Sequence, residues 1–116
     1  MRAHPIKWSD LESDRPMPMI ARRRVIGEQA MISDVTLDKG CVVAMHAHPQ
    51  EQFACVLSGR IRFTIETASG TEHHTLGPDE VMILPAGVPH AAEALERTRI
   101  LDIFSPPSEK TGIDAP

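Results

Sequence analysis

No apolar run in this chain is long enough to cross a bilayer, although 41% of its 116 residues are hydrophobic. Residues 1–16 also lack the basic start followed by an apolar stretch that is typical of a secretory signal. These two absences predict a soluble cytoplasmic protein without a membrane partner. Cysteine is scarce too, and in a reducing compartment we expect the two thiols, Cys41 and Cys55, to stay unpaired.

Basic residues are few, with 12 Lys and Arg against 16 Asp and Glu and a net charge of −4. Their one cluster, Arg22 to Arg24, stands at the start of a predicted strand and is more typical of a solvated edge than of a nucleic-acid contact. We therefore predict no nucleic-acid partner. The length suits a single domain, residues 1–116, because so short a chain can fill one hydrophobic core but not two.

What the sequence contains in abundance is a period-two alternation of apolar and polar residues, broken by Gly and Pro, which is typical of short β-strands. The predicted strands lie in the segments MISDVTLDKG, CVVAMHAH, FACVLSGRIRFTIETASG, HHTLG, VMILPAG and RTRILDIF. The break at Ser58 and Gly59 predicts a hairpin between the strands on either side. Only AAEALER has a spacing that suits one helical turn.

Seven or more short strands in one small domain need a closed or sandwiched sheet, because an open sheet would leave unpaired edges. The sequence therefore predicts an all-β fold, either a small barrel or a jelly roll. Residues 1–20 and 106–116 are rich in proline, and we expect an N-terminal arm and a C-terminal tail that cover the barrel or dock on a partner. Pairing of two copies would cover a sheet edge, so we expect a homodimer.

The segment MHAHPQEQF carries the residues best suited to hold a metal ion. His46 and His48 are two residues apart, so in an extended strand both imidazoles point to the same face. The same parity favours Gln52 over Glu51 as a further ligand. His90, presented by the turn in LPAGVPH, would complete the set from a distant loop. The alternative is that His-x-His is an ordinary polar face of a strand.

A carboxylate stands inside the otherwise apolar strand RILDIF. Asp102 shares one face with Ile100 and Phe104, and its burial costs stability unless the group is paired, protonated or placed in a polar cavity. In one interpretation Asp102 lies in a cavity near the metal and acts as a general acid or base. In the other it forms a structural ion pair with an arginine, for which the candidates are Arg60, Arg62 and Arg99.

The segments GCVVAMHAHPQEQ and PAGVPH resemble the two sequence motifs of the cupin superfamily. This resemblance implies a double-stranded β-helix, which is a jelly-roll barrel, with one divalent metal ion inside. It makes His46, His48 and His90 metal ligands and puts Gln52 where the family usually has glutamate. Imidazole and amide ligands suit nickel, zinc, iron and manganese, so the metal stays open. A neutral amide leaves the dication its full charge, which favours polarisation of a substrate oxygen over oxygen activation.

Three longer segments resemble, more narrowly, the KdgF family of small cupins: RRRVIGEQAM, HPQEQFACVLSGRIRFTI and VPHAAEALERTRILDIFSPP. This resemblance implies an enzyme of pectin and alginate breakdown that opens the ring of 4,5-unsaturated monouronates to give linear keto sugars. It makes Gln52 a metal ligand, Asp102 the catalytic acid or base and Phe104 part of the substrate pocket. The family usually has arginine, which can bind the uronate carboxylate, where this chain has Ser108.

Without that arginine, three possibilities stay open: the metal alone binds the carboxylate, the substrate is a different one, or the charge comes from Arg60, Arg62 or Lys110. Two other classes of function also stay open. Another metal-dependent cupin enzyme, such as an oxygenase or a sugar-acid isomerase, would share the ligands, and an oxygenase would consume oxygen. A non-catalytic sugar-binding cupin would bind its ligand without turnover and would not need Asp102.

Overall fold

The computed structural model describes residues 2–114 and confirms an all-β fold. The one helical element in this part of the chain is a short 3-10 turn, η1 (Trp8–Asp10), and no helix there has the length and hydropathy of a membrane-spanning segment. The strands are β1 (Ile20–Ile26), β2 (Met31–Leu37), β3 (Val42–His46), β4 (Glu51–Ser58), β5 (Ile61–Thr67), β6 (Gly70–Leu76), β7 (Val81–Leu84), β8 (His90–Ala94) and β9 (Thr98–Ser105).

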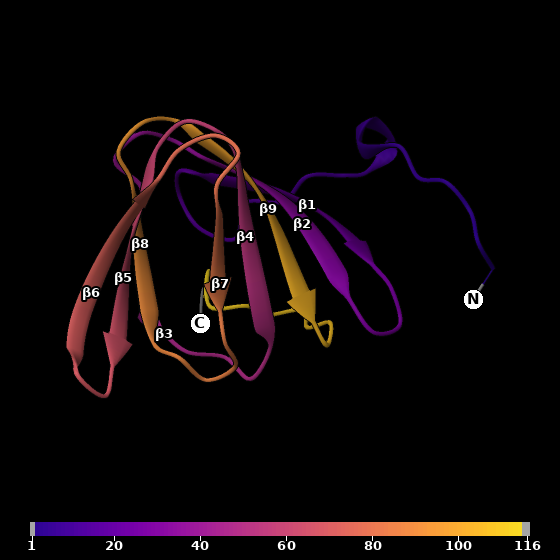
Figure 1. Cartoon of the computed structure of the whole chain (residues 1–116). Helices are drawn as coiled ribbons and strands as arrows, with labels where there is room; N and C mark the ends of the chain where they lie inside the picture. The colour runs from indigo at the N-terminus through magenta and orange to yellow at the C-terminus, as the bar shows by residue number, and fades with distance from the viewer. Residues whose placement is uncertain (1, 115–116) are drawn as a thin grey trace.

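The strands form two antiparallel sheets, one of five strands in the order β1-β2-β9-β4-β7 and one of four strands in the order β3-β8-β5-β6. Figure 1 shows the two sheets as facing walls that converge at the top of the view and diverge toward the bottom. The C-terminal segment, drawn in yellow, runs across the open end. This is the jelly-roll barrel expected from the sequence.

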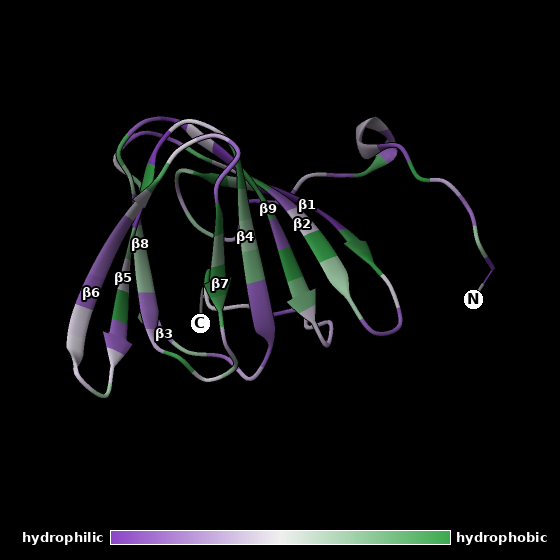
Figure 2. Ribbon diagram, in the orientation of Figure 1, coloured by the Kyte–Doolittle hydropathy of each residue, from purple (hydrophilic) through white to green (hydrophobic). Residues whose placement is uncertain are grey.

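Alternation along each strand decides which side chains fill the barrel. In β5, Ile61, Phe63 and Ile65 are buried while Arg62 between them is exposed. The edge strand β6 is an exception, because Leu76 is its one buried residue, and Figure 2 shows it largely in the hydrophilic colour. The hydrophobic core draws on both sheets and consists of Ile20, Val35, Leu37, Cys41, Val43, Ala54, Val56, Ile61, Phe63, Ile65, Leu76, Leu84, Ala94 and Ile100.

Two local predictions are wrong. The strands on either side of Ser58 and Gly59 do not form a hairpin, because β4 lies in the five-stranded sheet and β5 in the four-stranded one. The chain crosses between the sheets at Gly59, which has a φ of +87° and whose added methyl group would collide with the carbonyl oxygen of Arg97. Alternation shows which face is buried but not which strand is the neighbour. The segment AAEALER continues β8 into a bend instead of forming a helical turn.

The two ends of the chain meet on Arg22, which is buried and not the solvated edge residue expected from its cluster. Its Nε and Nη2 donate to the carboxylate of Asp14 in the N-terminal arm at 3.0 and 2.7 Å, and Nη2 donates to Asp114 in the C-terminal tail at 2.9 Å. Arg24 donates to the carbonyl oxygen of Glu109 at 2.8 Å. The tail is thereby held across the open end of the barrel.

Candidate metal centre

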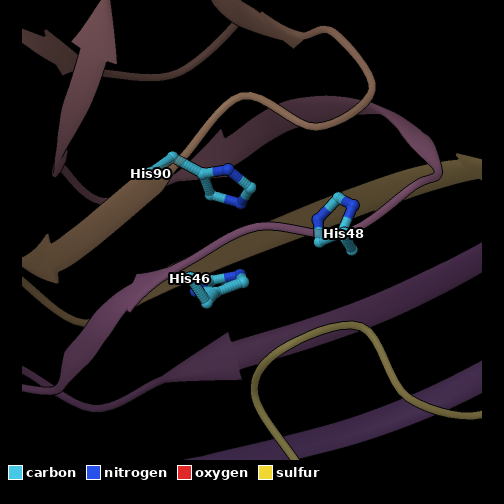
Figure 3. Close-up of side chains that lie close together, drawn as sticks. All are labelled: His46, His48 and His90. Atoms are coloured by element: carbon cyan, nitrogen blue, oxygen red, sulfur yellow. The ribbon is translucent and has the colours of Figure 1, made fainter.

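Three histidines from two distant parts of the chain meet inside the barrel. His46 ends β3 and His90 begins β8, and the two are direct partners across these antiparallel strands. His48 follows two residues later, on the loop to β4. One nitrogen of each ring lies within 4.8 Å of those of the other two, and Figure 3 shows the rings arranged around a common point. Two nitrogens that are each about 2.1 Å from one metal ion are at most about 4.2 Å apart, so the three rings are close to the arrangement that a single ion requires.

The three rings are oriented in the same way, each by a backbone carbonyl group two residues away. In general, a distance of about 2.7 to 3.2 Å between a nitrogen donor and a carbonyl oxygen is that of a hydrogen bond. When Nδ1–H donates to the carbonyl group, the lone pair of Nε2 is left free for a metal. The distances are 2.8 Å from His46 to Ala44, 3.0 Å from His48 to Gln50 and 2.9 Å from His90 to Val88.

Burial keeps His90 in the form that binds metals. Desolvation lowers the pKa of His90 to about 4, assisted by the proximity of His46 and His48 and opposed by the hydrogen bond to Val88. The imidazole of His90 is therefore neutral near pH 7, and only a neutral imidazole can ligate a cation.

Gln52 lies inside the barrel beside the histidines, while its neighbour Glu51 is exposed on the outer face. The amide Oε1 of Gln52 lies 3.0 Å from Nε2 of His48. The amide Nε2 of Gln52 donates to Oδ1 of Asp102 at 2.9 Å, which fixes which end of the amide points toward the histidines. An oxygen that faces the cluster in this way can serve as a fourth ligand.

The contact between His48 and Gln52 also tests whether a cation fits. Both nitrogens of His48 face oxygen acceptors at 3.0 Å, but a neutral imidazole has one N–H and can donate to only one of them. The lone pair of the other nitrogen then points at a lone pair of the second oxygen, and the two repel each other. A cation bound to both atoms removes this repulsion. Adjacent ligands of an octahedral ion, each about 2.1 Å from it, lie about 3 Å apart, which matches this contact.

The cluster opens onto a cavity between the sheets that is also lined by Asp102 and Phe104. The ring of Phe104 packs edge-on against that of His48, with centroids 5.7 Å apart. Burial raises the pKa of Asp102 to about 7, and the hydrogen bond from Gln52 opposes the rise only in part. The residue keeps some accessible surface because it lines the cavity. Near neutral pH both protonation states of Asp102 are accessible, which suits a group that transfers protons.

The arginines considered at the sequence level are not brought to Asp102, which has no ion-pair partner among residues 2–114. Arg99 instead makes two hydrogen bonds of 3.0 Å to Asp34 on the outer face. The side chain of Arg60 is 56% exposed, and its Nη1 lies 3.9 Å from Oε2 of Glu96. Arg62 is also exposed and faces away from the cavity. The parity of β5 already indicated this, because Arg62 alternates with residues of the apolar core.

The C-terminal tail contributes to the cavity in a way that its sequence does not indicate. Thr111 and Ile113 line the cavity wall. Gly112 lies so close to the imidazole of His46 that an added methyl group would collide with the ring. Ser108 stays outside the cavity lining and donates to the carbonyl oxygen of Lys110 at 2.8 Å. In the described chain, the residues that line the cavity include no lysine and no arginine.

Ser33 is a further cavity residue that the sequence analysis missed. A signal for it was present, because Ser33 is the polar member of a β2 face that otherwise consists of Met31, Val35 and Leu37. A serine on an apolar face of a predicted strand is a candidate for a polar contact inside the barrel.

A jelly-roll barrel with a histidine cluster in its interior defines a small protein with a candidate site for a divalent metal. The sequence matches the family described as "Cupin domain" over residues 33–104. It is 31% identical over 103 residues to the uncharacterized protein SCO3923 of Streptomyces coelicolor, a match that covers 87% of this chain and 94% of the relative. The chain belongs to the cupin family.

Solved structures of other cupins have the same fold. KdgF from Halomonas sp. superposes with a TM-score of 0.84 at 24% identity, covering 93% of this chain and 97% of that one. The oxalate decarboxylase of Bacillus subtilis, described as having Mn(II) centres, gives a TM-score of 0.82 at 23% identity and covers 94% of this chain but 31% of its own. These neighbours include enzymes, and their likeness to this chain is one of fold.

Proposed function

We propose that this cupin is a metal-dependent enzyme that opens the ring of 4,5-unsaturated monouronates, the sugars that lyases release from pectin or alginate. The observation that carries the proposal is the link from Asp102 through Gln52 to the histidine cluster, at 2.9 and 3.0 Å. It places a carboxyl group with a raised pKa and the candidate metal ligands on one cavity. The resemblance of the sequence to the KdgF family supplies the substrate class.

The residues divide the work between binding and proton transfer. His46, His48, His90 and Gln52 would hold one divalent ion, for which nickel, zinc, iron and manganese are the candidates. When bound, such an ion supplies a Lewis acid for a substrate oxygen. It is also the one positive charge that the described cavity can offer to the uronate carboxylate, since neither Arg60 nor Arg62 lines it.

Asp102 moves the proton. Its carboxylate takes the proton of the hydroxyl group on C1 as the bond between C1 and the ring oxygen breaks, which leaves an aldehyde at C1 and an enolate whose oxygen is on C5. The same group, now protonated, gives that proton to C4 as the enolate becomes a ketone, so the net change is an isomerisation. The hydrogen bond from Gln52 orients the carboxyl group, and Phe104 lines the same cavity beside His48.

The test is to follow the ultraviolet absorbance of an unsaturated monouronate in the presence of metal-loaded protein and to compare it with the spontaneous reaction. We expect acceleration by the wild type and a loss of about 10²- to 10⁴-fold in Asp102→Asn, the usual contribution of a general acid or base. Glu51→Gln is the matched control, because this carboxylate lies outside the barrel next to Gln52. No acceleration, or undiminished rates in Asp102→Asn, would contradict the proposal.

The same assay separates the other classes of cupin. An oxygenase would consume dissolved oxygen, which an oxygen electrode detects, whereas ring opening consumes none. A sugar-binding cupin would bind the monouronate without changing its absorbance. We retain from the sequence the expectation of a cytoplasmic protein whose partner is a small anionic sugar.

A further inference from the structure

We propose that Ser33 is a substrate-contacting residue whose hydroxyl group hydrogen-bonds a hydroxyl or ring oxygen of the sugar beside Asp102. This inference rests on the proposed function and names a residue that neither the family resemblance nor the comparisons assign. Its basis is a buried hydroxyl group without a partner on the wall of the cavity.

Ser33 lies on β2 and is the direct cross-strand partner of Asp102 on β9. Directly opposed residues of antiparallel strands have Cβ atoms about 5 Å apart and project to the same side. Gln52 approaches from the other neighbour of β9, strand β4. Asp102 is therefore flanked by polar side chains from both adjacent strands, and one of them, Ser33, is not used in holding the histidine cluster.

The hydroxyl group of Ser33 has no hydrogen-bond partner among the described residues, although the residue is only 1% exposed. A buried hydroxyl group without a partner lowers stability, and an alanine at this position would fill the same apolar face without that cost. The bonding capacity of Ser33 is thus unused by the protein itself. A sugar ring in the cavity offers several hydroxyl groups that can both donate to it and accept from it.

The test compares Ser33→Val with Ser33→Thr, two variants of equal size that differ in the hydroxyl group alone. We expect kcat/KM for the unsaturated monouronate to fall about three- to tenfold in Ser33→Val and to stay within about twofold of the wild type in Ser33→Thr. Metal content should match between the two, and Ser33→Val should have the higher thermal midpoint, because it lacks the buried hydroxyl group without a partner. Ser33→Ala, which removes the hydroxyl group without adding volume, should lose as much as Ser33→Val.

The outcomes separate this inference from the function on which it rests. If the wild type accelerates ring opening but Ser33→Ala and Ser33→Val keep its kcat and KM, Ser33 makes no contact and the proposed function stands. If the wild type gives no acceleration, both fail. If Ser33→Thr loses as much as Ser33→Val, the effect comes from shape and the inference is wrong.

Discussion

Replacement of Asp102 by asparagine should stabilise the metal-free protein at neutral and alkaline pH, even though it removes the proposed acid or base. Burial raises the pKa of Asp102 from 3.8 to about 7, so between these two pH values the folded protein binds a proton that the unfolded chain has lost. Stability therefore falls as the pH rises through this window, and it stays low above it. Asparagine cannot ionise, and its Oδ1 can still accept the hydrogen bond from Gln52.

The size of the effect follows from the same two values. Each unit between them corresponds to about 1.4 kcal/mol, so the full difference of about three units amounts to about 4 kcal/mol at pH 8. Near pH 4 the carboxyl group of Asp102 is protonated in the folded state, and the difference between the two proteins should almost vanish. This is the balance expected at an active site, where a group that serves the reaction lowers the stability of the fold.

The assay is urea unfolding followed by circular dichroism at pH 4 to 8, with both proteins freed of metal by a chelator. The quantity to plot is the difference in the free energy of unfolding between Asp102→Asn and the wild type, because the titration of the histidines cancels in it. Asp38→Asn, at an exposed position, controls for the loss of one formal charge. A variant that is no more stable at pH 8, or a gain that stays constant from pH 4 to 8, would refute the reasoning.

Three further predictions concern packing. Gly112→Ala should weaken metal binding about 10-fold or more in isothermal titration, because its methyl group displaces a ligand ring. Gly40→Ala is the matched control and should not weaken it, because Gly40 has a similar φ of +88° against +95° and its added methyl group would meet only Met19, at 3.9 Å. Ile61→Ala, at a core position that is 1% exposed, should cost about 2 to 5 kcal/mol in urea unfolding. Gly59→Ala should lower the thermal midpoint by several degrees, because the crossing between the sheets leaves no room for a methyl group.

Alternation in the sequence was sufficient to predict the fold class but not the strand neighbours. Ile61, Phe63 and Ile65 show their buried face through a period of two, and this pattern is local to one strand. Whether that strand pairs with β4 or with β6 depends on the direction of the turn at Gly59, which alternation does not encode. The predicted hairpin failed at this point, while the jelly roll as a whole was confirmed.

The candidate site shows the same division between local and long-range information. Parity along one extended segment favoured a common side for His46, His48 and Gln52, and the structure has all three inside the barrel. It did not show that the segment changes sheets between them, since His46 ends β3 and Gln52 lies on β4. The approach of Gly112 to His46 could not be foreseen, because the tail carries no periodic pattern and is positioned by Arg22 and Arg24, more than eighty residues away. Whether these residues ligate a metal stays a prediction.

The tail that packs on His46 bears on how the protein should be prepared. The described part of the tail reaches Asp114, whose carboxylate accepts a hydrogen bond from Arg22 at 2.9 Å. A polyhistidine tag attached shortly after Asp114 would bring rival imidazoles close to the three histidines, and the metal content of such a preparation would report the tag as well as the site. The N-terminal arm extends away from the barrel in Figure 1, so a tag there keeps its distance from the cavity.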